Sequence, residues 1–187
     1  MASVTENQKR FDEVFRTADE ARARTVALLR RVSQADSEKK PEPTAWSLGE
    51  IAHHLILTDL RTLYSVHLSV AEGKLDEFTP EQVKAARPFP LADTGDVAKT
   101  GKGTAPAFAI PTPGQSVTSL LGRLEQIRGV MKAELARLRD QDLGRLFVVH
   151  QRFGPLSLYD RIAFTSYHEQ KHVAQIERTA ASLGIRL

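Results

Sequence analysis

Apolar residues recur every three or four positions in four segments of this sequence, and each segment is typical of one face of an amphipathic helix. The polar positions between them form the opposite face of each predicted helix. The four segments are, approximately, residues 5–34, 46–71, 115–138 (directly after Pro113-Gly114) and 157–183. This pattern predicts an all-α protein.

The second segment opens with a clear helix start in the stretch WSLGEI, residues 46–51. Ser47 is suited to cap the first turn, and Glu50 is placed to reach back to the Ser47 amide as in a capping box. Trp46 and Ile51 flank the cap as a hydrophobic staple would. Because apolar residues lie around much of its circumference, this helix is expected to be central and well covered.

The connections between the helices differ greatly in length. A short polar connection is expected at residues 35–45. Residues 74–114 contain six prolines and four glycines, with one candidate short helix from Thr79 to about Ala86. A connection this long can run the length of a bundle, so the second and third helices are predicted to be parallel neighbours. Residues 147–149 favour extended backbone, but this run is predicted to be too short for a sheet of its own. The prediction for residues 1–187 is a single domain, a four-helix bundle with a long crossover between helices two and three.

The composition narrows the classes of function. The chain has no cysteine, which excludes disulfides, thiolate metal sites and cysteine nucleophiles. The net charge of +3 comes from basic residues scattered among acidic ones, without the concentrated stripe of a nucleic-acid-binding protein. The polar N-terminus lacks the apolar core of a secretion signal, and no apolar run of about 18 residues is present to span a membrane. We therefore expect a soluble cytoplasmic protein with no nucleic-acid or membrane partner.

Two of the six histidines lie four residues apart in the last predicted helix, in the stretch YHEQKH at residues 167–172. Residues at this spacing share one helical face, so the imidazoles of His168 and His172 can converge on one metal ion. His172 falls within the apolar stripe of the helix and His168 lies at its edge. Both are therefore expected to point into the bundle, where an unpartnered imidazole is costly.

The letters HEQKH also match the zinc-protease motif H-E-x-x-H. That motif belongs to a sheet-containing fold with a third ligand further along the chain. Here the periodicity is helical throughout and no histidine follows His172, so we predict no zinc protease. Glu169 is expected to face partly away from the pair and to be solvated. Gln175 can either orient a ligand or serve helix packing, and Asp59 can lie either beside the site or at the surface.

A catalytic metal site usually has three protein ligands and an open position, so a third ligand must come from another helix. The second helix offers His53 and His54. Helical phase does not choose between them, because that helix is apolar nearly all round. His67 lies four turns further along the same helix, too far to share their level. His150 precedes the last helix and is suited to line the mouth of a cavity.

Two longer stretches together resemble the signatures of the DinB-like, or YfiT-like, family. WSLGEIAHHL is similar to the family's Trp-Ser start followed by Glu-Ile-x-x-His-Leu. HQRFGPLSLYDRIAFTSYHEQKHVAQI is similar to the family's approach to a helix that bears His-x-x-x-His-x-x-Gln-Ile. The order, spacing and helical placement agree over nearly the whole chain. Gln151 departs from the pattern, because many relatives have proline at this position.

The resemblance implies a DinB-like four-helix bundle that holds a divalent metal with three histidines. His54 matches the histidine of the first signature, and His168 and His172 match the pair of the second. His53 is then an extra histidine that is suited to support the ligands. The resemblance implies nickel or zinc as the metal, with iron or manganese as alternatives.

The family includes thiol-dependent S-transferases, maleylpyruvate isomerases and proteins proposed as metal-dependent hydrolases. The resemblance therefore implies a metal-dependent enzyme that acts on a small molecule, with a low-molecular-weight thiol as one candidate. No catalytic side chain is predicted. The alternative is a non-catalytic helical bundle that binds metal or a partner protein. Homodimers are common among such bundles, although no apolar stripe of this sequence demonstrates one.

Overall fold

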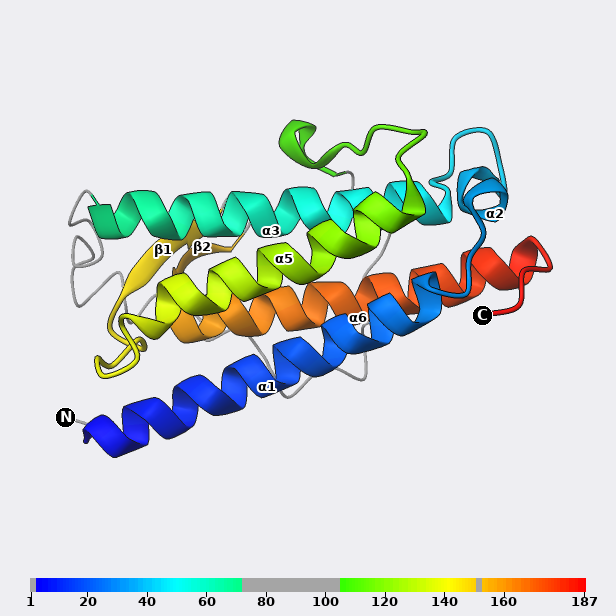
Figure 1. The fold of residues 1–187 in the computed structure, drawn as a ribbon. Helices are drawn as coiled ribbons and strands as arrows, with labels where there is room; N and C mark the ends of the chain where they lie inside the picture. The colour runs from blue at the N-terminus through cyan, green and yellow to red at the C-terminus, as the bar shows by residue number, and fades with distance from the viewer. Residues whose placement is uncertain (1–2, 72–104, 151–152) are drawn as a thin grey trace.

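The computed structural model describes residues 3–71, 105–150 and 153–187. In it, a serine residue begins each of the long helices. The long helices of the bundle, shown in Figure 1, are α1 (Val4–Leu29), α3 (Leu48–Ala71), α5 (Val117–Ala136) and α6 (Leu158–Ser182). Their caps are Ser3, Ser47, Ser116 and Ser157, whose hydroxyl oxygens accept hydrogen bonds from first-turn amides. The prediction of an all-α bundle of four helices is confirmed.

The predicted capping box of α3 is present. The Ser47 N–H donates to the Glu50 carboxylate at 2.8 Å, and the Glu50 N–H donates to Ser47 Oγ at 3.2 Å. Lys40 Nζ also donates to this carboxylate, at 2.9 Å. Burial raises the pKa of Glu50, but the Ser47 amide and Lys40 together hold that pKa below its ordinary value. The start of α3 is therefore firmly placed, one turn before His54.

The first connection differs from the prediction. α1 ends at Leu29 rather than near residue 34, because Ser33 takes an extended backbone and caps a separate short helix, α2 (Gln34–Glu38). The polar connection expected at residues 35–45 therefore begins inside a helix. α2 packs closely on α3, where a Cβ at Gly49 would stand 3.2 Å from the Ser37 carbonyl oxygen. Glycine at this position permits that approach.

A two-stranded antiparallel sheet connects α5 to α6. Its strands are β1 (Phe147–His150) and β2 (Gly154–Ser157). Residues 147–149 were predicted to be too short for a sheet of their own, and they form one because β2 supplies a partner strand, with Val148 opposite Leu156. Gly154 has a φ of +74°, a left-handed conformation that favours glycine where the chain turns into β2.

Side-chain contacts between the helices define their directions. α1 and α6 run parallel, α1 and α5 run antiparallel, and α3 and α6 run antiparallel, as the colours in Figure 1 also show. α3 and α5 are therefore parallel neighbours, as predicted for helices joined by a long crossover. For α1 and α6 these contacts are Asn7–Tyr159 and Arg24–Glu177. For α1 and α5 they are Gln8–Asp140 and Arg30–Glu125. For α3 and α6 they are His54–His168 and Thr62–Arg161.

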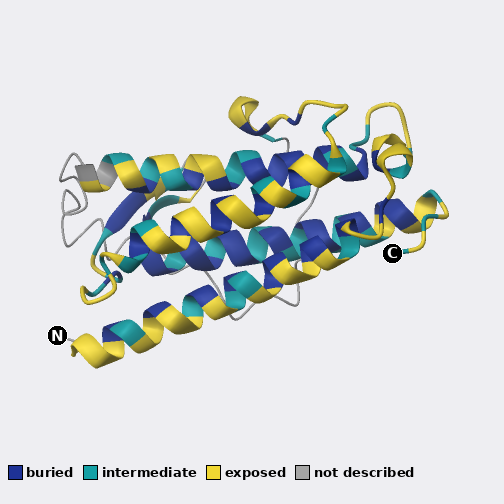
Figure 2. Cartoon of the chain, in the orientation of Figure 1, coloured by how far each residue is buried: buried dark blue, intermediate teal, exposed yellow. Residues whose placement is uncertain are grey.

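The core of the bundle has two apolar clusters with a polar layer between them. One cluster includes Leu29 of α1, Ile51 of α3 and Ile176 of α6, and the other includes Phe15, Met131 and Ile162. Figure 2 shows that the buried residues line the facing sides of the helices. On every long helix, a buried charged residue lies between the stretches that contribute to the two clusters. These residues, the polar layer, are Arg22, Asp59, Arg128 and Glu169.

Two further predictions concern the rest of the chain. The short helix expected from Thr79 to about Ala86 lies outside the described residues. Among the helices that the structure describes, none is long and apolar enough to cross a membrane.

Candidate metal centre

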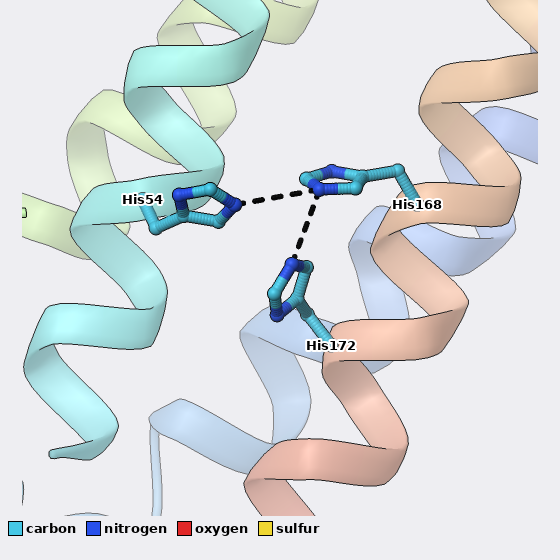
Figure 3. A group of neighbouring side chains, drawn as sticks. All are labelled: His54, His168 and His172. Atoms are coloured by element: carbon cyan, nitrogen blue, oxygen red, sulfur yellow. Dashed lines mark hydrogen bonds between the residues drawn. The ribbon is translucent and has the colours of Figure 1, made fainter. Parts of the chain in front are cut away.

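Three histidines from two antiparallel helices face one another near the middle of the bundle. His54 comes from α3, and His168 and His172 come from successive turns of α6 (Figure 3). His168 Nε2 lies 3.4 Å from His54 Nε2 and 3.1 Å from His172 Nε2. Each of the three residues offers a ring nitrogen within 4.8 Å of the others. The structure thus brings together the three residues that the family resemblance singled out.

The spacing of these nitrogens fits a metal ion. Two imidazole nitrogens that bind a tetrahedral ion at about 2.0–2.1 Å lie about 3.3–3.4 Å from each other. The observed separations of 3.4 and 3.1 Å are close to this value. The ligand nitrogens of His54 and His172 lie within 4.8 Å of each other, so a divalent ion fits between the three rings once the side chains adjust.

Hydrogen bonds on the outer side of the rings direct Nε2 lone pairs toward the centre. The Nδ1–H of His54 donates to the Ala109 carbonyl oxygen at 2.7 Å, and the Nδ1–H of His172 donates to Gln175 Oε1 at 2.7 Å. Both rings then present an unprotonated Nε2 to the centre. A proton on His168 Nε2 can serve only one of these two neighbours. At least one of the two Nε2–Nε2 contacts therefore joins two lone pairs with no proton between them. Two lone pairs that face each other at this distance indicate a site built for a cation.

The electrostatics of the triad keep the imidazoles neutral. Burial lowers the pKa of His54, although its hydrogen bond to Ala109 acts in the other direction. Burial, followed by the neighbouring His172 and His54, holds the pKa of His168 well below its ordinary value. Burial and the neighbouring His54 lower the pKa of His172 to about 3. At neutral pH the three rings are therefore neutral imidazoles, as histidine ligands of a metal must be.

The structure also shows why His54, and not its neighbour, joins the pair on α6. The backbone N–H of Thr112 donates to His53 Nδ1 at 2.9 Å, so His53 faces the end of the long crossover instead of the triad. That stretch includes the short 3-10 helix η3 (Ala107–Ala109), whose last carbonyl group orients His54. The two adjacent histidines thus hold the same segment, and only one of them contributes a nitrogen to the centre.

The two remaining histidines lie outside the triad. His67 is exposed and stands 13 residues beyond His54 on α3, a rise of about 20 Å along the helix. The ring of His150 lies 4.7 Å from that of Phe164, centroid to centroid. Phe164 in turn stacks on His168 at 5.6 Å and contacts Phe153 at 5.5 Å. An aromatic wall therefore runs from the triad to the two-stranded sheet. Sequence reasoning missed it, although Phe164 precedes His168 by one helical turn.

Glu169 does not face solvent, and the prediction that it was solvated was wrong. Its side chain is 1% exposed and accepts hydrogen bonds from Arg22 Nε at 2.5 Å and Arg128 Nη2 at 3.0 Å. The same two arginines reach Asp59 Oδ2, at 2.8 and 3.4 Å, which places Asp59 in the buried interior rather than at the surface. The partners come from α1 and α5, so the periodicity of α6 alone could not reveal them. A carboxylate held in this way is not placed to act as the base of a zinc protease.

Comparisons with known proteins agree with this architecture. The family model described as the DinB superfamily matches residues 17–176. The chain is 24% identical over 160 residues to the uncharacterised protein YuaE of Bacillus subtilis (strain 168), across 85% of this chain and 92% of that protein. It is also similar to a solved structure of YfiT from Bacillus subtilis, with a TM-score of 0.58 and 16% identity over 94% of this chain and 89% of that chain. YfiT is described as a probable metal-dependent hydrolase with an unusual four-helix bundle topology.

Proposed function

The chain belongs to the DinB superfamily, and on this premise we propose that it is a divalent-metal-dependent enzyme that acts on a small molecule. The observation that carries the proposal is the convergence of three Nε2 atoms at metal-ligand spacing, from His54, His168 and His172. The proposed metal is nickel or zinc, with iron or manganese as alternatives, because imidazole nitrogen suits these ions. The proposed reaction is thiol S-transfer or hydrolysis.

In this proposal the three histidines hold the ion, and their supporting hydrogen bonds keep the rings in place. The Ala109 carbonyl and the Gln175 amide oxygen fix the ring orientations of His54 and His172 before an ion arrives. When bound, the ion supplies Lewis acidity, which polarises a carbonyl group or lowers the pKa of a thiol or water in an open position. Phe164 stacks on His168 and covers that face of the ligand ring.

The carboxylates near the site favour thiol transfer over a reaction that needs a protein base. Asp59 and Glu169 are both engaged with arginines in the polar layer. Neither of these two carboxylates is therefore available to accept a proton at the metal centre. A thiol has an ordinary pKa of about 8.5, so Lewis acidity alone can deliver the thiolate at neutral pH.

Elemental analysis of freshly purified protein tests the metal site. We expect a divalent metal in the wild-type protein and much less of it in His172→Ala. The matched control is His67→Ala, which removes an exposed histidine of α3 and is expected to retain wild-type metal. Equal metal content in the wild type and His172→Ala would contradict the proposal. The metal-loaded protein is then assayed with thiols and electrophilic substrates, and afterwards with esters and amides.

The alternative proposal is a non-catalytic bundle that binds metal or a partner protein, and the engagement of both nearby carboxylates supports it. The two proposals differ in the accessibility of the ion. An open coordination position binds acetohydroxamate, whereas an ion that is capped by protein does not. Binding of acetohydroxamate to the metal-loaded protein, measured by calorimetry, therefore favours the enzyme.

A further inference from the structure

The interior beside the metal centre contains more positive than negative charge. Three buried arginines lie in or next to the polar layer, namely Arg22, Arg128 and Arg161, and each is at most 7% exposed. Among the residues that the structure describes, two buried carboxylates accompany them there, those of Asp59 and Glu169. Within the described part of the chain, this region of the core therefore holds one more cation than anion.

Direct contacts identify which arginine is unbalanced. Arg22 contacts both carboxylates, through Nη2 to Asp59 at 2.8 Å and through Nε to Glu169 at 2.5 Å. Arg128 also contacts both, with Nη2 at 3.0 Å from Glu169 and 3.4 Å from Asp59. The two carboxylates are thus shared between two arginines, and the third arginine has no ion pair among the described residues.

The Arg161 guanidinium group is held by a hydrogen bond to a neutral side chain. Its Nη2 donates to the Thr62 hydroxyl oxygen at 2.6 Å, and its Nη1 is buried without a hydrogen-bond partner in the described part of the chain. Burial lowers the pKa of Arg161 to about 10 in spite of the attraction of Asp59, so the group stays protonated at neutral pH. A buried cation of this kind is costly unless an anion joins it.

The position of Arg161 relates it to the metal centre. It lies seven residues before His168 on the same face of α6, which is about 10 Å along the helix. Across the bundle, its partner Thr62 lies eight residues beyond His54 on α3, a similar distance. Phe164 lies between the two sites: its ring centroid is 5.5 Å from the Arg161 guanidinium carbon and 5.6 Å from the His168 ring.

We propose that Arg161 binds a carboxylate group of the substrate while the reacting end of the same molecule reaches the three-histidine centre. The proposal rests on the proposed function and adds a substrate class, an elongated small molecule with a carboxylate about 10 Å from its reacting atoms. The incoming carboxylate supplies the negative charge that the interior lacks, and the planar guanidinium group is suited to it. Thr62 orients the guanidinium group, and the Phe164 ring packs against the spacer of the substrate.

Probes with a metal-binding head test this inference by calorimetry on the full-length, metal-loaded protein. Suberic acid monohydroxamate carries a hydroxamate for the ion and, at a distance of about two helical turns, a carboxylate for Arg161. Its terminal amide has the same length without the charge, and acetohydroxamate has the head alone. We expect the carboxylate probe to bind about tenfold more tightly than the amide, as a charge-assisted hydrogen bond provides.

Three variants test whether the Arg161 side chain causes the preference for the carboxylate probe over the amide probe. Arg161→Met is expected to bind both long probes equally while it retains wild-type affinity for acetohydroxamate. Arg161→Lys keeps the charge and is expected to keep part of the preference. Arg178→Met removes an exposed arginine of the same helix and is expected to keep all of it. Thermal unfolding by circular dichroism establishes that each variant is folded.

The outcomes separate this inference from the function on which it rests. No preference for the carboxylate probe in the wild type, or the same preference in Arg161→Met, overturns the inference while acetohydroxamate binding still supports the metal site. A wild-type protein that takes up no metal, or that does not bind acetohydroxamate, overturns the proposed enzyme and this inference with it.

Discussion

The polar layer makes Glu169 the side chain whose neutralisation should destabilise the bundle most. The Glu169→Gln change keeps the size of the side chain and removes its charge. Arg22 and Arg128, which now share two carboxylates, would then have Asp59 alone. Both arginines are almost completely buried, so water cannot replace the missing carboxylate.

The structure sets the expected size of this effect. Breaking a buried ion pair by removing one partner typically costs about 3–5 kcal/mol. The lower value is expected here, because the glutamine amide oxygen can still accept one hydrogen bond. For a chain of 187 residues, a loss of about 3 kcal/mol lowers the melting temperature by about 6–12 °C.

Thermal and urea unfolding, followed by circular dichroism, measure the loss against a matched control. Glu177 lies on the same helix and pairs with Arg24, but both side chains are exposed, at 42% and 64%. Glu177→Gln is therefore expected to cost less than about 1 kcal/mol. Adding Arg22→Met to Glu169→Gln should recover part of the loss, because it removes a cation left without a partner. Equal effects of the two glutamate changes would refute the reasoning.

Three further outcomes follow from the site and its supports. Gln175→Leu removes the acceptor of His172 Nδ1 and should weaken metal binding about 10–100-fold in competition with a chelating dye, whereas Gln170→Leu should not change it. The metal-free protein should lose stability as the pH falls from about 6.5 toward 3, because His168 and His172 stay neutral when folded but take up protons when unfolded. His172 contributes about 1.4 kcal/mol per pH unit in that window, so a pH titration of urea unfolding should be less steep in His172→Leu; an unchanged slope would contradict the assignment. Ser47→Ala removes the cap of α3 and should cost about 0.5–2 kcal/mol in the same unfolding assay, and no loss would argue against the capping box.

Local patterns predicted the helices and two of the three histidines of the site. Apolar periodicity predicts a helix because it reports one buried face, and the stretch from Ser47 to Glu50 placed the start of α3 correctly. The spacing of His168 and His172 placed both on one face of α6. Periodicity could not choose between His53 and His54, since α3 has no clear polar face to define an orientation. The choice depends on a hydrogen bond from Thr112, 59 residues further along the chain.

Features that depend on distant partners were missed for a physical reason. A glutamate on an amphipathic helix is usually solvated, and burial of Glu169 becomes favourable because Arg22 of α1 and Arg128 of α5 approach it. The strand pair was missed although its partner is close in the sequence, because neither strand is evident without the other. Residues 147–149 are too few to be a stable sheet alone, and they become a strand because Gly154 turns the chain back beside them.

The parallel pairing of α1 and α6 sets the order in which the protein can be assembled during its synthesis. α1 leaves the ribosome early, but its partner helix follows only after the crossover, α5 and the two strands have been made. His54 likewise waits for His168, 114 residues later. Until then α1 can reach α5, which it also contacts in the finished bundle, but the part of its apolar face that packs on α6 stays uncovered. Uptake of the proposed metal would therefore follow synthesis of α6, so the ion could stabilise the finished bundle but could not guide its early folding.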